Sequence, residues 1–311
     1  MLAVPMDILS QFPVRKSKAQ KQAFRDSVKT YAESLGYPVS IEKGSFGVRN
    51  VVIGNPESAK YLVTAHYDTC ARMVLPNMIT PCNLLIYLVY QILVLLTILV
   101  PSLAVGFLFG WIPGVKGFAG TAALAVYWGL LLLMMRGPAN PNNANDNTSG
   151  VVTLLEIARS IPENQRSKVC FVLFDLEEAG LLGSAAYAKA HKPQVKNQVV
   201  LNMDCVGDGD HILLMPTKKL KKDIPKFTPI FKACGYFGAK SILVKDKGYY
   251  FYPSDQSNFP YGVGIAAFHK KKGMGLYFSR IHTPKDTVLD QTNVNLLRAA
   301  ITTVICGDAA Q

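Results

Sequence analysis

Acidic residues are scarce in this chain of 311 residues, which carries 21 Asp and Glu against 33 Lys and Arg and a formal net charge of +12. The basic residues are scattered and form no nucleic-acid recognition motif, so we do not predict nucleic-acid binding. An acidic membrane surface accounts for the positive charge equally well. The six cysteines include no C-x-x-C pair and have no framework spacing, so we expect free thiols in a reducing compartment.

Other familiar signals are also missing. The N-terminus lacks a charged segment followed by an apolar core, and the sequence therefore predicts no signal peptide. Internal repeats and low-complexity segments are absent as well.

Charge is missing altogether between Met73 and Val115. Within this stretch, residues 84–110 exceed the roughly 20 apolar residues that are needed to cross a bilayer. A second apolar run, 118–135, has about 18 residues, near the shorter limit, and ends at Arg136. These runs predict a transmembrane helical hairpin, for which the alternative is a pair of buried core helices.

A hairpin returns the chain to the side of the membrane that it left, so the flanking segments can fold together. We therefore expect a catalytic α/β domain formed by residues 1–80 and 137–311, with the hairpin inserted at 81–136. Lys60, Arg72 and Arg136 flank the hairpin, whereas its turn carries only Lys116. The positive-inside rule then predicts a two-pass membrane protein whose catalytic domain is cytoplasmic.

Outside the hairpin, apolar strands alternate with helical patterns. Strands are predicted at 61–68, 168–180 and 198–207, and helices at 149–160 and 181–191, the first of them capped by Thr148 or Ser149. This alternation predicts an α/β fold with a mixed, mostly parallel sheet between helices. In such sheets, binding sites form beyond the carboxyl ends of the strands.

Acidic and histidine side chains stand at those strand ends and in two loops. If they converge, several carboxylates share one crevice and oppose folding unless cations lie between them. Two divalent ions would remove that repulsion, and histidine with carboxylate ligands suits zinc first, with cobalt or manganese as alternatives. The competing interpretation is a set of ordinary helix caps and surface charges. The residues concerned are His66, Asp68, Asp146, Glu177, Glu178, Asp204 and His282.

The motifs around these residues resemble the M28 family of di-zinc aminopeptidases. The resemblance covers residues 45–80 and 138–306 and rests on H-x-D, N-D-N-x-S-G, E-E-x-G-L-x-G-S, N-x-D and I-H-T-P-K-D-T, in this order. M20 metallopeptidases share H-x-D and E-E, but the other segments match M28 better. The resemblance implies a zinc-exopeptidase-like fold, which the hairpin would interrupt.

The resemblance also implies a role for each residue. His66 and Asp204 would bind one zinc, Glu178 and His282 the other, and Asp146 would bridge the two. Asp68 would orient His66. Glu177 would be the general base that activates a metal-bridging hydroxide.

The sequence departs from the family at two positions. Many relatives have a tyrosine before the final histidine ligand, where it can stabilise the oxyanion, but this chain has Ile281. Tyr250 or Tyr252 is a candidate replacement. The alternative for either is an aromatic side chain that serves only for packing. Gln256 stands where relatives often have histidine.

The leading hypothesis is a membrane-anchored zinc aminopeptidase acting on short peptides with a free N-terminus. The alternatives are a glutaminyl-cyclase-like zinc enzyme and a non-catalytic membrane scaffold with the peptidase fold. The lipid bilayer is an expected partner, and helix packing between hairpins would allow a homodimer.

Overall fold

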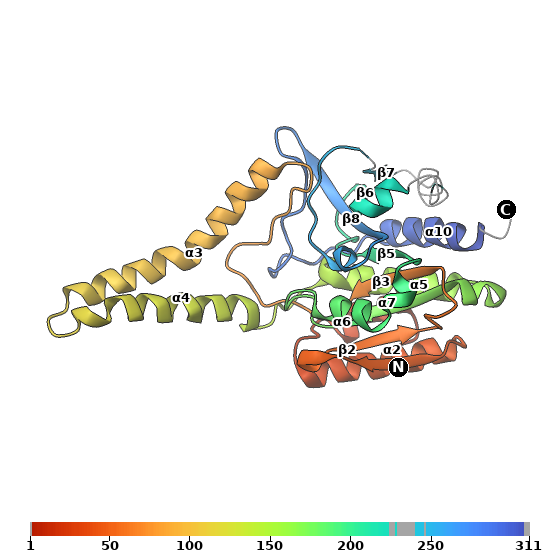
Figure 1. Cartoon of the computed structure of the whole chain (residues 1–311), viewed down its shortest axis with the longest axis horizontal. Coiled ribbons are helices and arrows are strands. Elements are labelled where there is room, and N and C mark those ends of the chain that lie inside the picture. The colour runs from red at the N-terminus through yellow and green to blue at the C-terminus, as the bar shows by residue number, and fades with distance from the viewer. Residues whose placement is uncertain (1, 224–227, 229–239, 246, 308–311) are drawn as a thin grey trace.

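A nine-stranded sheet forms the centre of the computed structural model, which describes residues 2–223, 228, 240–245 and 247–307 (Figure 1). Eight strands follow the order β1-β2-β4-β3-β5-β8-β6-β7, and β9 pairs with β8. The strands are β1 (Val39–Lys43), β2 (Arg49–Ile53), β3 (Tyr61–His66), β4 (Val169–Phe174), β5 (Val199–Met203), β6 (His211–Pro216), β7 (Ser241–Val244), β8 (Gly262–Lys271) and β9 (Gly275–Tyr277).

The middle of the sheet is parallel and its edges are mixed. Strands β4, β3, β5 and β8 run parallel, and so do β6 and β7. The antiparallel pairs are β1 with β2, β2 with β4, β6 with β8, and β8 with β9. This arrangement confirms the predicted mixed α/β fold with a mostly parallel sheet.

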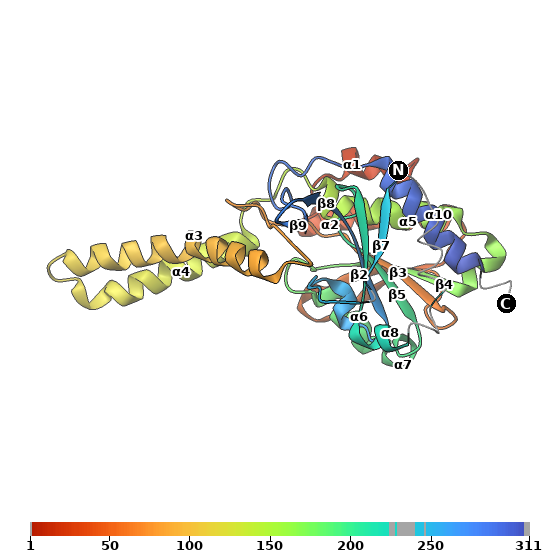
Figure 2. The same cartoon turned by 90° about the horizontal axis from the view of Figure 1, so that it is seen from above.

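Helices cover both faces of the sheet (Figure 2). Side chains alternate along each strand, so Val63 and Ala65 of β3 pack with α2, α5 and α10, whereas Leu62 packs with α6 and α7 on the other face. The helices are α1 (Ile8–Gln11), α2 (Lys18–Ser34), α3 (Leu84–Trp111), α4 (Ala119–Arg136), α5 (Gly150–Ser160), α6 (Leu182–Ala190), α7 (Lys192–Val195), α8 (Lys218–Lys222) and α10 (Gln291–Gly307).

The three predicted strands exist but end earlier than expected. Strand β3 ends at His66, β4 at Phe174 and β5 at Met203. The remaining predicted site residues from these segments therefore lie in the loops beyond the sheet, where the backbone is free to turn. Because β4, β3 and β5 are adjacent and parallel, all three loops leave the same edge of the sheet.

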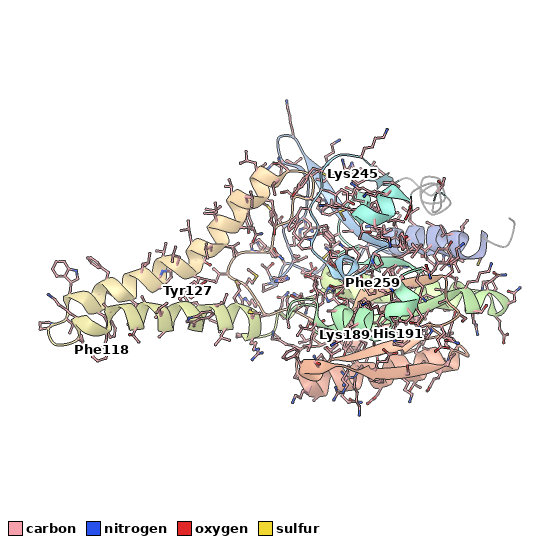
Figure 3. All side chains as sticks on the ribbon, in the orientation of Figure 1. Phe118, Tyr127, Lys189, His191, Lys245 and Phe259 are labelled. Atoms are coloured by element: carbon pink, nitrogen blue, oxygen red, sulfur yellow. The ribbon has the colours of Figure 1, made fainter. Side chains whose placement is uncertain are left out.

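Helices α3 and α4 form a hairpin that projects away from the sheet (Figures 1 and 2). Both are long and apolar enough to cross a membrane, and the apolar window is 17% buried in Leu84–Trp111 and 0% buried in Lys116–Arg136. Phe118 and Tyr127 lie on this projecting part (Figure 3). The alternative of two buried core helices is therefore wrong for this chain.

The chain leaves and re-enters the α/β body at adjacent points. Ala71 and Ala139 form an antiparallel bridge, Arg72 N–H donates to the Pro138 carbonyl and Asn140 N–H donates to the Cys70 carbonyl. An insertion with adjacent ends leaves the surrounding fold continuous.

Residues 72–83, which we call the stalk, connect this bridge to α3. Met73 N–H donates to the His282 carbonyl at 2.9 Å, and Asn77 N–H donates to the Ile281 carbonyl at 3.2 Å. Ile79 and Phe278 exchange two further backbone hydrogen bonds. The stalk is thus bonded along the loop that carries the last predicted ligand.

The described cysteines agree with the expectation of free thiols. Cys70, Cys82, Cys170, Cys205 and Cys306 are all unpaired. Cys234 lies outside the described residues.

Candidate metal centre and active site

The loops at the carboxyl edge of the sheet bring the predicted histidines and carboxylates together. His66 ends β3, Asp204 follows β5, Glu177 and Glu178 follow β4, and Asp146 precedes α5. His282 comes from the loop before α10 and has a φ of 62°, which is uncommon for a residue with a Cβ.

Asp146 lies between the two histidines. Its Oδ1 is 3.3 Å from His66 Nε2, and its Oδ2 is 3.1 Å from His282 Nε2. Each histidine nitrogen has a second carboxylate beside it: Asp204 Oδ1 lies 3.5 Å from His66, and Glu178 Oε2 lies 3.4 Å from His282. The donors therefore form two neighbouring groups that share one carboxylate.

Asp68 supports both sides of this arrangement. Its carboxylate accepts the backbone N–H groups of Glu177 at 3.0 Å and Glu178 at 3.3 Å. The other ring nitrogen of His66, Nδ1, is 3.2 Å from the Asp68 carbonyl and 3.6 Å from its carboxylate. Asp68 thus fixes the turn that carries both glutamates and lies against the outer nitrogen of His66.

The two glutamates point to different histidines. Glu178 lies against His282, whereas Glu177 groups with His66 and Asp204, with ligand atoms within 4.8 Å of one another. The Oε1 atom of Glu178 is buried and has no hydrogen-bond partner among the described residues. An unpartnered buried carboxylate oxygen is unfavourable unless a cation neutralises it.

The asparagines around Asp146 attach its loop to neighbouring loops. Asn145 Oδ1 accepts the N–H groups of Gly207 and Asp208, and Asn147 Nδ2 donates to the Met203 carbonyl. Asn147 Oδ1 also accepts the N–H of Gly150 at 3.0 Å. Ser149 stands at the N-cap position of α5, as predicted, but its hydroxyl donates back to the Asn145 carbonyl, so the capping hydrogen bond is made by the Asn147 side chain instead.

The mutual electrostatics are strong because the cluster is buried. Burial alone would lower the pKa of His282, but Glu178, Asp146 and Asp286 raise it to about 9. Burial raises the pKa of Glu178 to about 8, with Asp146 adding to the effect and His282 opposing it. Burial would also raise the pKa of Asp146, yet its hydrogen bonds to the two histidines hold that pKa below the usual range. Without a metal, protons on the histidines balance the carboxylates.

The pKa of Glu177 shifts in the opposite direction to that of Asp146. Burial, together with Glu178, Asp255 and Asp204, raises its pKa well above the usual value, although His66 opposes the shift. A raised pKa makes the Glu177 carboxylate a stronger proton acceptor, which suits a general base.

A cavity of about 270 Å³ opens beside the cluster. Asn77 and Ile79 of the stalk form part of its wall, together with Tyr252, Phe278 and Ile281. Glu178 also borders a second cavity of about 420 Å³, together with Met135 and Arg136 at the end of α4. The stalk and the end of α4 therefore both adjoin the candidate site.

The structure places the two residues that differ from the family pattern, Ile281 and Gln256, and the two candidate tyrosines. Ile281 is 3% exposed and packs with Ile79, Tyr252 and Phe278. Tyr252 borders the cavity, but its hydroxyl donates to the Asp204 carbonyl at 3.0 Å, whereas Tyr250 lies under the Lys221 ammonium. Gln256 is buried away from the cavity, where its Nε2 donates to the Tyr252 carbonyl.

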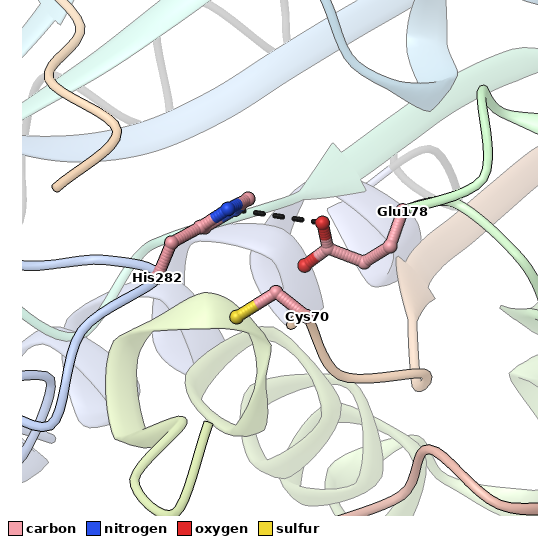
Figure 4. A group of neighbouring side chains, drawn as sticks. All are labelled: Cys70, Glu178 and His282. Carbon is pink, nitrogen blue, oxygen red and sulfur yellow. Dashed lines mark ion pairs between the residues drawn. The ribbon is translucent and has the colours of Figure 1, made fainter. Parts of the chain in front are cut away.

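Three contributors were missed by sequence reasoning. Asp286, within the last motif, accepts the N–H groups of Asn145 and Asp146 at 2.8 and 3.0 Å. Cys70 lies beside Glu178 and His282, with its thiol in the same group of candidate ligand atoms (Figure 4). Asn77 borders the cavity from the stalk. Motif membership could have pointed to Asp286, but no local signal marks Cys70 or Asn77.

The donor set fits zinc. Two imidazoles and three carboxylates are zinc ligands of the usual types, and they form two groups that share Asp146. The unpartnered oxygen of Glu178 is a further sign that a cation belongs there.

Together, the fold and the site define an α/β protein with a histidine–carboxylate cluster at the carboxyl edge of a mostly parallel sheet. Its fold is similar to that of a Zn-dependent exopeptidase from Parabacteroides distasonis ATCC 8503, with a TM-score of 0.59 and 18% identity over 97% of this chain and 95% of that one. It is also similar to that of a glutaminyl cyclase from Porphyromonas gingivalis, with a TM-score of 0.58 and 16% identity over 98% and 96% of the two chains.

The chain belongs to peptidase family M28, whose profile matches residues 132–305. This finding confirms the predicted family. A segment of 75 residues is 40% identical to aminopeptidase YwaD of Bacillus subtilis (strain 168), covering 22% of this chain. The similarity spans only 16% of the length of that curated relative.

Proposed function

We propose that this protein is a membrane-anchored, zinc-dependent aminopeptidase that hydrolyses the N-terminal peptide bond of short peptides. The observation that carries the proposal is the position of Asp146, whose two oxygens lie 3.3 and 3.1 Å from histidines of different loops. Membership in peptidase family M28 supports the reaction class.

Two zinc positions account for this geometry. His66 and Asp204 would hold one ion, His282 and Glu178 the other, and Asp146 would contribute one oxygen to each. Asp68 would keep the outer nitrogen of His66 oriented, because the residue next to a ligand sets its tautomer and ring angle. When bound, zinc supplies Lewis acidity that polarises the scissile carbonyl and lowers the pKa of the attacking water toward ~7.

Glu177 would move the proton. Its carboxylate takes a proton from the attacking water and returns it to the nitrogen of the leaving amine, so the carboxylate is regenerated in each cycle. The raised pKa that burial and the neighbouring acids give Glu177 supports the first of these steps, the uptake of the proton. The hydrogen bond from Glu177 N–H to Asp68 would hold the base in place.

The hairpin would anchor the catalytic α/β domain, residues 1–80 and 137–311, to a bilayer through residues 81–136. The support is its length, its apolar character and its lack of burial. More positive charge flanks the hairpin than lies in its turn, which supports a cytoplasmic domain. A homodimer remains a prediction.

The test compares free-amine dipeptides with their N-acetylated forms, using detergent-purified, zinc-loaded protein. We expect cleavage of the free-amine set alone, and a loss of ~10²–10⁴ in kcat for Glu177→Gln, with its zinc content unchanged. Cleavage of acetylated peptides at equal rates would contradict an aminopeptidase. A protein that binds no zinc and cleaves nothing would instead support the scaffold hypothesis.

Glutaminyl cyclisation is the second candidate, favoured by the fold similarity to the P. gingivalis glutaminyl cyclase. The same preparation should be given peptides with N-terminal glutamine and assayed for ammonia release. Ammonia without peptide hydrolysis would favour the cyclase; the shared position of Asp146 between two donor groups favours the peptidase.

A further inference from the structure

Peptide hydrolysis places negative charge on the oxygen of the scissile carbonyl. A hydrogen-bond donor aimed at that oxygen stabilises the transition state more than the ground state. The sequence lacks a donor at position 281, where the isoleucine side chain is buried against Phe278. A side-chain donor that acts beside the proposed zinc would therefore come from another residue that borders the cavity.

Outside the histidine–carboxylate cluster, three of the described residues that border the 270 Å³ cavity have a donor group in the side chain: Asn77, Cys205 and Tyr252. The Tyr252 hydroxyl donates to the Asp204 carbonyl at 3.0 Å, and the Cys205 thiol donates to the Asp204 carboxylate at 3.3 Å. Both donors are already used in holding Asp204.

The Asn77 amide differs from the other two. It forms no hydrogen bond with a described side chain or backbone group, although the backbone of Asn77 is hydrogen-bonded. The Asn77 backbone N–H donates to the Ile281 carbonyl at 3.2 Å, which sets Asn77 opposite the residue that precedes His282.

The stalk also keeps Asn77 from moving away. On one side, Met73 is bonded to His282; on the other, Ile79 pairs with Phe278. The Tyr90 hydroxyl, from the first turns of α3, donates to the Pro76 carbonyl at 2.7 Å. Asn77 therefore has an amide without a described partner on a fixed backbone, and the fixed backbone keeps that donor at the cavity.

We propose that the Nδ2 group of Asn77 donates a hydrogen bond to the scissile carbonyl oxygen as negative charge develops on it. The stalk that leads to α3 then contributes a catalytic residue. This inference rests on the proposed peptidase function.

The test measures kcat and KM for a free-amine dipeptide with Asn77→Ala, Asn77→Asp and Tyr252→Phe. We expect kcat to fall ~10²–10³-fold for Asn77→Ala, the range for loss of one such donor, with KM changed by less than about threefold. Asn77→Asp keeps the shape but replaces the donor by a charged acceptor, so its kcat should fall at least as far. Val74→Ala is the matched control, since Val74 is 89% exposed in the same stalk.

A second measurement does not depend on turnover. A phosphonate dipeptide analogue, which imitates the tetrahedral intermediate, should bind Asn77→Ala more weakly by a factor similar to the loss of kcat. Binding of the product amino acid and the zinc content should stay unchanged.

The outcomes separate the inference from the proposed function. An active wild type that needs Glu177 but tolerates Asn77→Ala within about threefold would overturn the inference alone. A ~10²-fold loss in Tyr252→Phe with normal Asn77→Ala would assign the donor to Tyr252 instead. A zinc-loaded wild type that hydrolyses no free-amine peptide would overturn both.

Discussion

Asp286 accepts the backbone N–H of Asp146 at 3.0 Å, and so the motif that carries one histidine also positions the acid between the two histidines. Its other oxygen accepts the N–H of Asn145 at 2.8 Å. Burial, together with Asp146, raises the pKa of Asp286 to about 7. Asp286 is 1% exposed, and its carboxylate forms no other hydrogen bond with the described residues.

Asp286→Asn should weaken zinc binding without direct contact to the metal. The amide keeps one acceptor oxygen but turns an NH₂ group toward a backbone N–H, which loses a hydrogen bond and costs ~1–3 kcal/mol. We expect zinc affinity to fall ~10–100-fold, the range for residues that support ligands. Zinc titration with a competing chelator measures the loss of zinc affinity, and urea unfolding measures the loss of stability.

The control is Asp26→Asn, which changes an exposed acid on α2. Unchanged zinc affinity in Asp286→Asn would show that the Asp146 loop holds its shape without this contact.

Removing zinc should lower the thermal stability of the protein as well as its activity. The carboxylates of Asp146, Glu178 and Asp204 share one buried crevice, and a bound cation offsets their repulsion. At free zinc 100-fold above Kd, binding to the folded state alone adds about 2.7 kcal/mol.

Differential scanning fluorimetry across a zinc series measures this effect. The expected curve is a Tm that rises with zinc in the wild type and much less in a His66→Ala and His282→Ala double variant. A Tm that is independent of zinc in the wild type would contradict the site.

Asp290 should make stability depend on pH in the acid range. Its Oδ1 accepts the Thr292 N–H at 2.7 Å at the start of α10, and its Oδ2 faces Lys240. The Lys240 hydrogen bond lowers the pKa of Asp290, while its partial burial opposes the shift. A lowered folded-state pKa stabilises the fold above the unfolded value of about 4, and this contribution disappears as the pH falls through the folded value.

Asp290→Asn removes the charge of the side chain but keeps the helix cap, because asparagine also caps helices. The side chain is 34% exposed, so we expect a difference in unfolding free energy of only about 0.5 kcal/mol at pH 7. Urea unfolding of both proteins at pH 7, 4 and 3 should show the difference shrinking toward zero. A difference that persists at pH 3 would locate the effect in the cap rather than the charge.

Replacing residues 84–136 with a flexible Gly–Ser linker should release the protein from membranes while retaining the stalk. The ends of the insertion are bridged at Ala71 and Ala139, so the α/β body keeps its connection. We expect the full chain to resist alkaline carbonate extraction and the shortened chain to be soluble without detergent, with zinc still bound.

If the full chain is released by carbonate, the hairpin does not span the bilayer. If the shortened chain is soluble but has lost zinc, α3 and α4 are needed to hold the stalk against the loop of His282.

The sequence alone identified the class of fold and the cluster. Apolar strands are recognisable because continuous burial in a parallel sheet demands unbroken hydrophobic runs, and polar residues at their carboxyl ends converge once those strands are adjacent. His66 and Glu178 were found this way, Asp146 and His282 were found in loops that precede helices, and the structure brings all four together. The hairpin was visible because uncharged runs of this length are rare in soluble proteins.

Tertiary structure decided what depends on contacts between distant segments. Asp286 supports Asp146 across 140 positions of sequence, and Asn77 reaches the cavity because the stalk is bonded to the loop of His282. Local propensity carries no information about such partners, since the hydrogen-bonding capacity of an Asn or Asp is the same wherever it stands. The cap of α5 shows the same limit: Ser149 stands at the N-cap position, but its hydroxyl accepts the Val206 N–H of a neighbouring loop, and Asn147 makes the capping hydrogen bond.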